Sequence, residues 1–241
     1  MAREQPTQQP PPVQRLRIRY AKRGRLRFTS HRDFSRAFER AVFRARVPMA
    51  YSSGFNPHPR ISYAGAAPTG SASEAEYLEI ALAQSVDIAA IQALLVEALP
   101  TGLDILEVVD STGPALSDLL QASRWQIEIA VPAADLVPAV DRFREAESVV
   151  VERMTKKGLR EFDCRAPVVE MVASAAGEDG SATVVDLLLR HTVPSVRPDD
   201  VLSGICAVAG LELSAVPLLT RLSQGLLDED THEISDPLHA S

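Results

Sequence analysis

The sequence predicts an α+β protein made of two tandem ferredoxin-like (βαββαβ) units with antiparallel sheets. Short segments that alternate between apolar and polar residues are typical of half-buried strands, and longer segments with helical spacing separate them. The order strand, helix, paired strands, helix, strand occurs twice along the chain, which is the ferredoxin-like pattern. The chain has 241 residues, 46% of them hydrophobic, which suffices for two domains of about 100 residues each.

Composition and pattern together set the predicted boundaries. The N-terminal stretch is polar and rich in proline, without the apolar segment of a secretory signal. The boundaries are a disordered lead at 1–12, a basic domain at 13–111, a linker at 112–122, an acidic domain at 123–226 and a disordered tail at 227–241. With no apolar run long enough for a membrane span, we expect a cytoplasmic protein.

The basic domain begins with two alternating segments. In "VQRLRIRY" (13–20), Leu16 and Ile18 share one face, and the three arginines Arg15, Arg17 and Arg19 share the other. This period of two predicts a half-buried strand. "GRLRF" (24–28) alternates again and places Arg25 and Arg27 together, so a second strand is expected there.

A helix is predicted after Ser30, which can cap it, with Asp33 three residues further on in a pattern like a capping box. Its apolar stripe recurs at helical spacing, and Pro48 ends it near Arg46. Arginines follow at steps of four along one flank of this helix, namely Arg32, Arg36, Arg40 and Arg44.

The remaining elements complete the two units. Further strands of the basic domain are expected near 49–53, 60–66, 76–82 and 102–111, with a helix in 85–99. In the acidic domain, strands are expected at 123–131, 148–155, 159–166, 168–174, 182–192 and 214–224, and helices at 133–147 and 197–210.

Charge is segregated along the chain. Residues 1–70 hold 14 Arg and Lys against three acids, whereas the remainder holds 11 bases against 29 acids. Such segregation suggests a first part that faces a polyanion, although the two halves could also simply attract each other. Aromatic residues are interleaved with the bases, which fits single-stranded RNA better than duplex DNA.

The predicted RNA contacts come from the strand arginines, the helix flank and the loop "SGFNPHPR". Arginine suits phosphate oxygens and base edges and can stack on bases. The predicted RNA-binding residues are Arg15, Arg17, Arg19, Arg25, Arg27, Arg32, Arg36, Arg40, Phe55, Asn56 and Arg60.

Two histidines are candidates for proton transfer. His31 stands at the predicted helix start, where it is either a packing residue or a general base or acid. His58 lies between Pro57 and Pro59, so the loop is either a rigid turn or a functional loop that brings His58 near His31. Their spacing matches no zinc-ligand pattern, and two cysteines are too few for a cluster site. No metal is therefore predicted.

Three runs carry a family resemblance: "RFTSHRDFSRAFERA", "YSSGFNPHPRISYA" and "SEAEYLEI". They resemble the radical-SAM-linked protein family, whose uncharacterised members occur beside, or fused to, a particular radical SAM protein. The resemblance covers about a quarter of the chain and transfers no catalytic residue. It implies a radical SAM protein as partner. This chain lacks the three-cysteine motif, so the iron–sulfur cluster and S-adenosylmethionine are expected on that partner.

A more distant likeness is to CRISPR RNA-processing proteins, which are similar in using tandem ferredoxin-like units. The glycine-rich loop typical near their C-termini is absent here, where "RLSQGLLDED" holds only Gly225. The leading hypothesis is an RNA-binding accessory protein that works with a radical SAM enzyme in tRNA or rRNA modification. The alternatives are a metal-independent RNA endonuclease that uses His31 or His58, and a protein-interaction adaptor without RNA binding.

Overall fold

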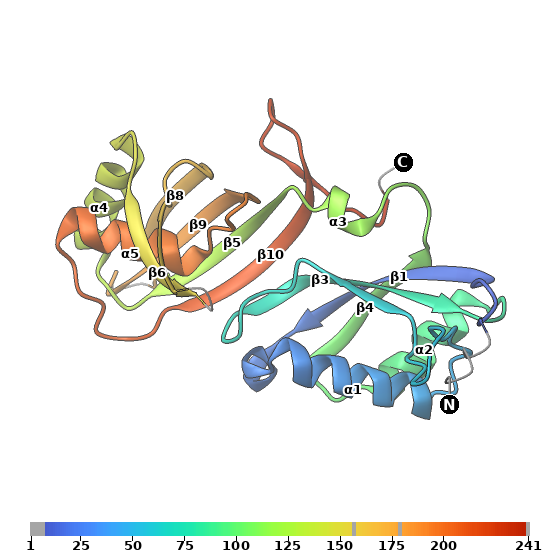
Figure 1. Cartoon of the computed structure of the whole chain (residues 1–241). Coiled ribbons are helices and arrows are strands. Elements are labelled where there is room, and N and C mark those ends of the chain that lie inside the picture. Colours follow the sequence, from blue (N-terminus) through green and yellow to red (C-terminus); the bar gives the residue numbers. More distant parts are fainter. Residues whose placement is uncertain (1–7, 156–157, 178–179, 240–241) are drawn as a thin grey trace. The chain divides into compact units, whose positions relative to one another are not determined.

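The computed structural model describes residues 8–155, 158–177 and 180–239. These residues form two compact units, the N-terminal unit (8–119 with 237–239) and the C-terminal unit (the described part of 120–236). In each unit, helices pack on one face of an antiparallel sheet (Figure 1). The predicted α+β class with antiparallel sheets is confirmed. No helix among the described residues is both long and apolar enough to cross a membrane.

The N-terminal unit has the predicted βαββαβ order, with two short additions. Its strands pair in the order β4-β1-β3-β2, and every pair is antiparallel. In chain order its elements are β1 (Gln14–Lys22), the 3₁₀ helix η1 (Gly24–Phe28), α1 (His31–Arg44), β2 (Ile61–Ala64), β3 (Ala72–Leu82), α2 (Ile88–Ala98), β4 (Leu103–Asp110) and α3 (Leu116–Leu119).

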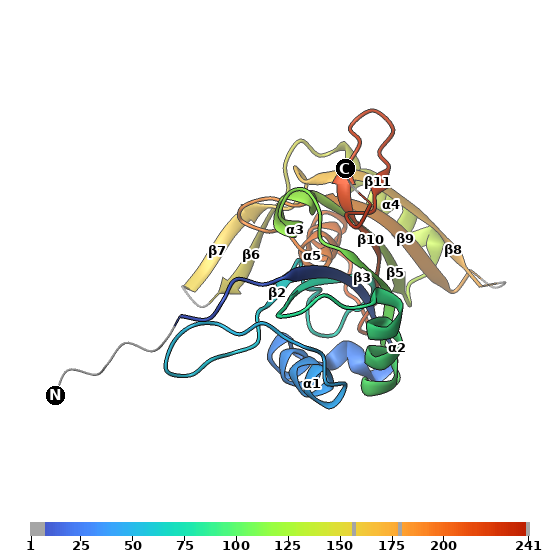
Figure 2. The same cartoon turned by 90° about the vertical axis from the view of Figure 1, so that its right-hand side faces the viewer.

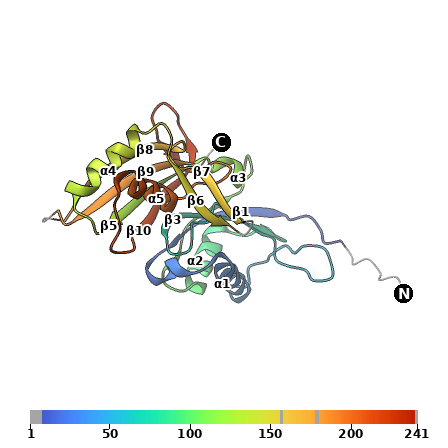
Figure 3. The same cartoon turned by 60° about the vertical axis from the view of Figure 1, so that its left-hand side comes forward.

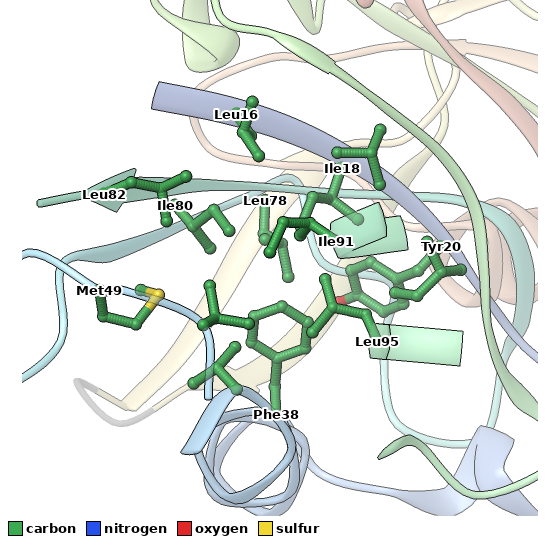
Figure 4. Close-up of a cluster of buried hydrophobic side chains, with 14 of the residues drawn as sticks. Leu16, Ile18, Tyr20, Phe38, Met49, Leu78, Ile80, Leu82, Ile91 and Leu95 are labelled. Atoms are coloured by element: carbon green, nitrogen blue, oxygen red, sulfur yellow. The ribbon is translucent and has the colours of Figure 1, made fainter. Parts of the chain in front are cut away.

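The core of this unit lies between its sheet and the helices α1 and α2 (Figure 4). Leu16 and Ile18 alternate with the arginines of β1, as predicted, and both are fully buried. Phe38 from α1 and Leu95 from α2 meet them from the helix side. Each such side chain stabilises the fold by about 1.5–3 kcal/mol relative to its exposed state.

The prediction of a strand at 24–28 is wrong, because this segment forms the 3₁₀ helix η1 instead. Gly24 has a φ of +55°, a left-handed conformation that turns the chain away from the sheet. The amide of Leu26 then donates to the carbonyl of Arg23, and that of Thr29 donates to Leu26. Arg25 and Arg27 therefore do not join the arginines of β1 on the sheet.

Helix α1 begins and ends close to the predicted positions. The Ser30 hydroxyl accepts a hydrogen bond from the Asp33 amide at 3.2 Å, which is the predicted N-cap. At the other end, Arg46 has a φ of +53°, and the Val47 amide donates to the carbonyl of Val42. This turn fixes the path of the chain out of the helix.

The C-terminal unit repeats the same arrangement around one insertion. Its sheet order is β10-β5-β9-β8, and β11 pairs with β10. Strands β6 and β7 form a separate hairpin (Figure 3), so 148–155 is not a strand of the main sheet. Its elements are β5 (Ala122–Ile129), α4 (Ala133–Glu145), β6 (Val150–Thr155), β7 (Gly158–Asp163), β8 (Val168–Ala176), β9 (Ala182–Arg190), α5 (Pro198–Ala209), β10 (Leu218–Leu227) and β11 (Ile234–Ser235).

The ends of the chain and the segment between the units show more structure than predicted. The lead at 1–7 lies outside the described residues, and the Gln9 amide donates to the Ser53 hydroxyl at 2.9 Å. The predicted linker contains α3, and the units divide at 119/120. The tail predicted to be disordered holds β11, and Leu238 is buried. The periodicity of so short a strand is too brief to read from sequence.

Candidate nucleic-acid interface

The arginines of β1 share one face of the strand, as the alternation predicts, but their guanidiniums donate hydrogen bonds to acceptors within the protein. Arg15 donates to the Glu79 carboxylate at 2.8 Å, and Arg19 Nε donates to the Glu74 carbonyl at 3.0 Å. Arg17 is 1% exposed and donates to the carbonyl of Pro114. Its guanidinium is therefore not open to phosphate, contrary to its predicted role as an RNA contact.

The arginines of η1 lie at the start of α1. Arg25 is exposed, and the Arg27 guanidinium lies 4.6 Å from the centre of the Phe28 ring. Phe28 itself is 59% exposed. A guanidinium over an aromatic face is a stabilising arrangement at the surface, so this pair forms a small basic and aromatic patch.

The flank of α1 presents the most accessible positive charge of the candidate residues. We define the α1 flank as Arg32, Arg36, Arg40 and Arg44, and all four side chains are exposed. Unlike Arg15 and Arg17, none of them forms an ion pair within the described part of the chain. Three members of the flank line a hollow of about 930 Å³ with Phe43, Glu39, Ala98 at the end of α2 and Pro100 beyond it.

Phe43 and Arg46 were not predicted as site residues. Phe43 lies outside the buried stripe of α1, and its side chain is 81% exposed. It lines both the hollow described above and a second hollow of about 670 Å³. The signal was present in the sequence, because a phenylalanine off the apolar stripe of an amphipathic helix faces solvent.

His31 is exposed at the first turn of α1 and packs against β2. Its ring meets the Tyr63 ring edge-on at 4.9 Å, and its Nδ1 lies 3.3 Å from the Ser35 hydroxyl. Burial raises the pKa of the Tyr63 hydroxyl to about 12. These contacts give His31 a packing role between α1 and β2.

The proline loop joins α1 to β2 and projects from the N-terminal unit (Figure 2). Phe55, Asn56 and His58 are exposed there. The amide of His58 donates to the Ser52 hydroxyl at 3.0 Å and the amide of Ser52 donates back to the His58 carbonyl. Arg60 Nε donates to the Tyr51 carbonyl at 3.1 Å, so its guanidinium partly closes the loop.

The structure does not bring His31 and His58 together. His31 begins α1, a helix of 14 residues that is about 20 Å long. The two residues that flank the loop, Tyr51 and Pro59, line a hollow with Val42 and Phe43 at the other end of α1. The predicted shared histidine site is therefore wrong. No group of three or more metal-ligating side chains occurs among the residues with defined positions.

Taken together, the fold and this surface define an α+β protein with an exposed arginine row on a helix of its first unit. A family model described as "Uncharacterized protein conserved in bacteria (DUF2344)" matches residues 15–198. The chain belongs to this family. The matched residues include α1, the proline loop and both hollows. No curated protein matches the chain.

Proposed function

We propose that this protein is an RNA-binding accessory protein that works with a separate radical SAM enzyme in the modification of tRNA or rRNA. The observation that carries the RNA proposal is the contrast within the N-terminal unit. Arg15 and Arg17 are held by acceptors of the fold, whereas the α1 flank is exposed and has no ion pair among the described residues.

The geometry of the α1 flank suits a phosphate backbone. Residues four apart on a helix are separated by a rise of about 6 Å along its axis, which is comparable to the spacing of neighbouring phosphates in an extended strand. Four guanidiniums in such a row repel one another, and only Asp33 and Glu39 oppose them on α1. An anionic ligand removes that repulsion, and arginine binds phosphate through two parallel hydrogen bonds.

The radical SAM partner is proposed from the resemblance of α1 and the proline loop to the radical-SAM-linked family. The cysteine chemistry of this chain is compatible with a cluster on the partner. Burial raises the pKa of the Cys164 thiol to about 12 and also raises that of Cys206. Cluster ligation requires thiolates, and these two thiols are poorly suited to supply them.

The test is a salt titration of RNA affinity on a variant of the α1 flank. The variant Arg36→Gln, Arg40→Gln, Arg44→Gln removes three exposed charges from one hollow. Fluorescence anisotropy with a short single-stranded RNA should give a log–log salt slope that is flatter by about 2, since each phosphate contact contributes about 0.7. The free energy of unfolding should change by less than about 0.5 kcal/mol per site, because the side chains are exposed.

A matched control removes three exposed arginines from the C-terminal unit: Arg142→Gln, Arg144→Gln, Arg160→Gln. It should leave the salt slope nearly unchanged. Equal losses in both variants would show non-specific attraction and contradict the proposed site. RNA cleavage lost in His31→Ala would favour the endonuclease instead, and co-purification of a radical SAM protein without any RNA affinity would favour the adaptor.

A further inference from the structure

The second hollow, next to the C-terminal end of α1, has the composition of a pocket for a planar apolar group. It measures about 670 Å³, within the range of about 300–1,000 Å³ for ligand pockets. Buried side chains form its floor, namely Val42, Val47 and Met49. Phe43 and Tyr51 supply aromatic walls, and Arg44 and Arg46 bring positive charge. We call it the Phe43–Tyr51 hollow.

Phe43 is fixed in place by its element although its side chain is exposed. It lies in the last turn of α1, where the Arg46 amide donates to its carbonyl at 3.1 Å. A phenylalanine side chain that is 81% exposed leaves most of its apolar surface in water and adds little to folding. An exposed aromatic ring on a backbone held in a helix is the kind of platform on which bases stack.

Tyr51 forms the second wall from a different segment. Its side chain is 39% exposed, and its backbone pairs with Pro59 across the base of the proline loop. The Arg60 guanidinium also donates to the Tyr51 carbonyl. The hydrogen bonds that close the loop therefore hold this wall opposite the end of α1.

We propose that the Phe43–Tyr51 hollow binds one unpaired nucleobase of the RNA strand whose phosphates contact the α1 flank. This inference rests on the proposed function and adds that the RNA is single-stranded at this point. Arg44 lines both hollows, so a strand that passes along α1 can place a phosphate at Arg44 and the neighbouring base beside Phe43. In an A-form duplex the bases are stacked and paired, and their faces cannot reach such a platform.

Glu39 gives this hollow a hydrogen-bond acceptor for the edge of a base. It is the only carboxylate among the described residues that line the hollow, and it also lines the first hollow. A carboxylate accepts hydrogen bonds from the amino groups of base edges. The hollow thus combines apolar walls for a ring with one acceptor and two cationic groups.

The experiment measures RNA affinity of the full chain by fluorescence anisotropy with three probes. They are a short single-stranded RNA of mixed sequence, the same strand with abasic sites in place of its bases, and a blunt duplex of that sequence. The variants are Phe43→Ala, Phe43→Trp and, as a control for an exposed apolar side chain elsewhere, Val216→Ala.

Phe43→Ala should weaken binding of the single strand by about 5- to 150-fold, the range for the loss of one stacked base. It should change binding of the abasic strand and the duplex less than about 2-fold, because those probes offer phosphates but no free base. Phe43→Trp should restore the affinity, and Val216→Ala should leave it unchanged.

Two outcomes separate this inference from the proposed function. If Phe43→Ala has no effect while Arg36→Gln, Arg40→Gln, Arg44→Gln loses affinity, RNA binding stands and the base pocket is overturned. If the wild-type chain binds none of the probes, the proposed function fails and the pocket fails with it. Equal wild-type affinity for the single strand, the abasic strand and the duplex would also overturn the pocket.

Discussion

The outer face of β1 and the flank of α1 carry similar rows of arginine within one unit, and the fold uses them in opposite ways. On β1, Arg15 and Arg17 find acceptors in Glu79 and the Pro114 carbonyl. On α1, the four arginines of the flank remain exposed without an ion pair in the described residues. Arginine side chains therefore stabilise the fold on the strand, whereas on the helix their positive charge remains available to a ligand.

The difference arises from what lies opposite each row. An antiparallel strand places a cross-strand partner about 5 Å from each residue, and Glu79 of β3 pairs in register with Arg17. A surface helix has no such partner on its outer side, where only residues three and four apart along the helix are neighbours. On α1 each of the four arginines has another arginine four residues away, and the two acids of the helix, Asp33 and Glu39, each lie three residues from Arg36.

The largest expected effect is on stability, in Arg17→Ala. This change leaves the Pro114 carbonyl without its donor and takes a guanidinium from beside Glu79. Removing one partner of a buried charged pair costs about 3 kcal/mol, so urea denaturation should show a clear loss in the free energy of unfolding. Arg15→Ala is the matched control on the same strand and should cost less than about 1 kcal/mol, because that side chain is half exposed. Equal small losses in both variants would end the distinction between the two rows.

Sequence patterns predicted which face the arginines of β1 and α1 occupy but not what each one contacts. The alternation in β1 and the spacing in α1 depend on local geometry, and both were confirmed by the structure. The burial of Arg17 depends on Pro114, 97 residues further along the chain, and no local pattern encodes that contact. The 3₁₀ helix η1 depends on the positive φ of Gly24, which competes with the alternation of "GRLRF".

The candidate site was predictable to the same degree. Arg32, Arg36 and Arg40 are exposed along one flank of α1 as the helical spacing indicates. The separation of His31 from His58 could not be predicted, because it depends on where the proline loop leaves the end of α1. Phe43 could have been found from its place outside the apolar stripe.

A moderate effect on stability is expected from Ser30→Ala, which tests whether the N-cap stabilises α1 independently of the arginines of the α1 flank. The Ser30 hydroxyl accepts from the Asp33 amide, and loss of such a cap costs about 1 kcal/mol. The thermal midpoint should fall, while RNA affinity of the folded protein should stay the same, since Ser30 lies outside the α1 flank. Ser30→Thr keeps both the acceptor for the Asp33 amide and the hydroxyl donor to the Asp33 carboxylate, and it should retain the wild-type midpoint. A large loss of RNA affinity in Ser30→Ala under folding conditions would place the site at the N-terminal end of α1.

The smallest effect concerns Tyr63, which lies between the two regions because β2 carries it beneath α1 against His31 and Phe34. Burial raises the pKa of its hydroxyl from 10.0 to about 12. The folded state therefore holds this proton more tightly than the unfolded state, and the unfolded chain releases it first as pH rises. The resulting contribution to stability is complete below pH 10 and is lost between about pH 10 and 12.

Tyr63→Phe removes this titration, so the thermal midpoint of the variant should fall less steeply with pH than that of the wild type between about pH 10 and 12. At pH 8 the free energies of unfolding of the two proteins should differ by less than about 1 kcal/mol. Tyr51→Phe, which alters an exposed ring in the Phe43–Tyr51 hollow, is the control and should follow the wild-type curve. Identical slopes for wild type and Tyr63→Phe would mean that the hydroxyl is not buried beneath α1, and the packing that positions the helix on the sheet would need revision.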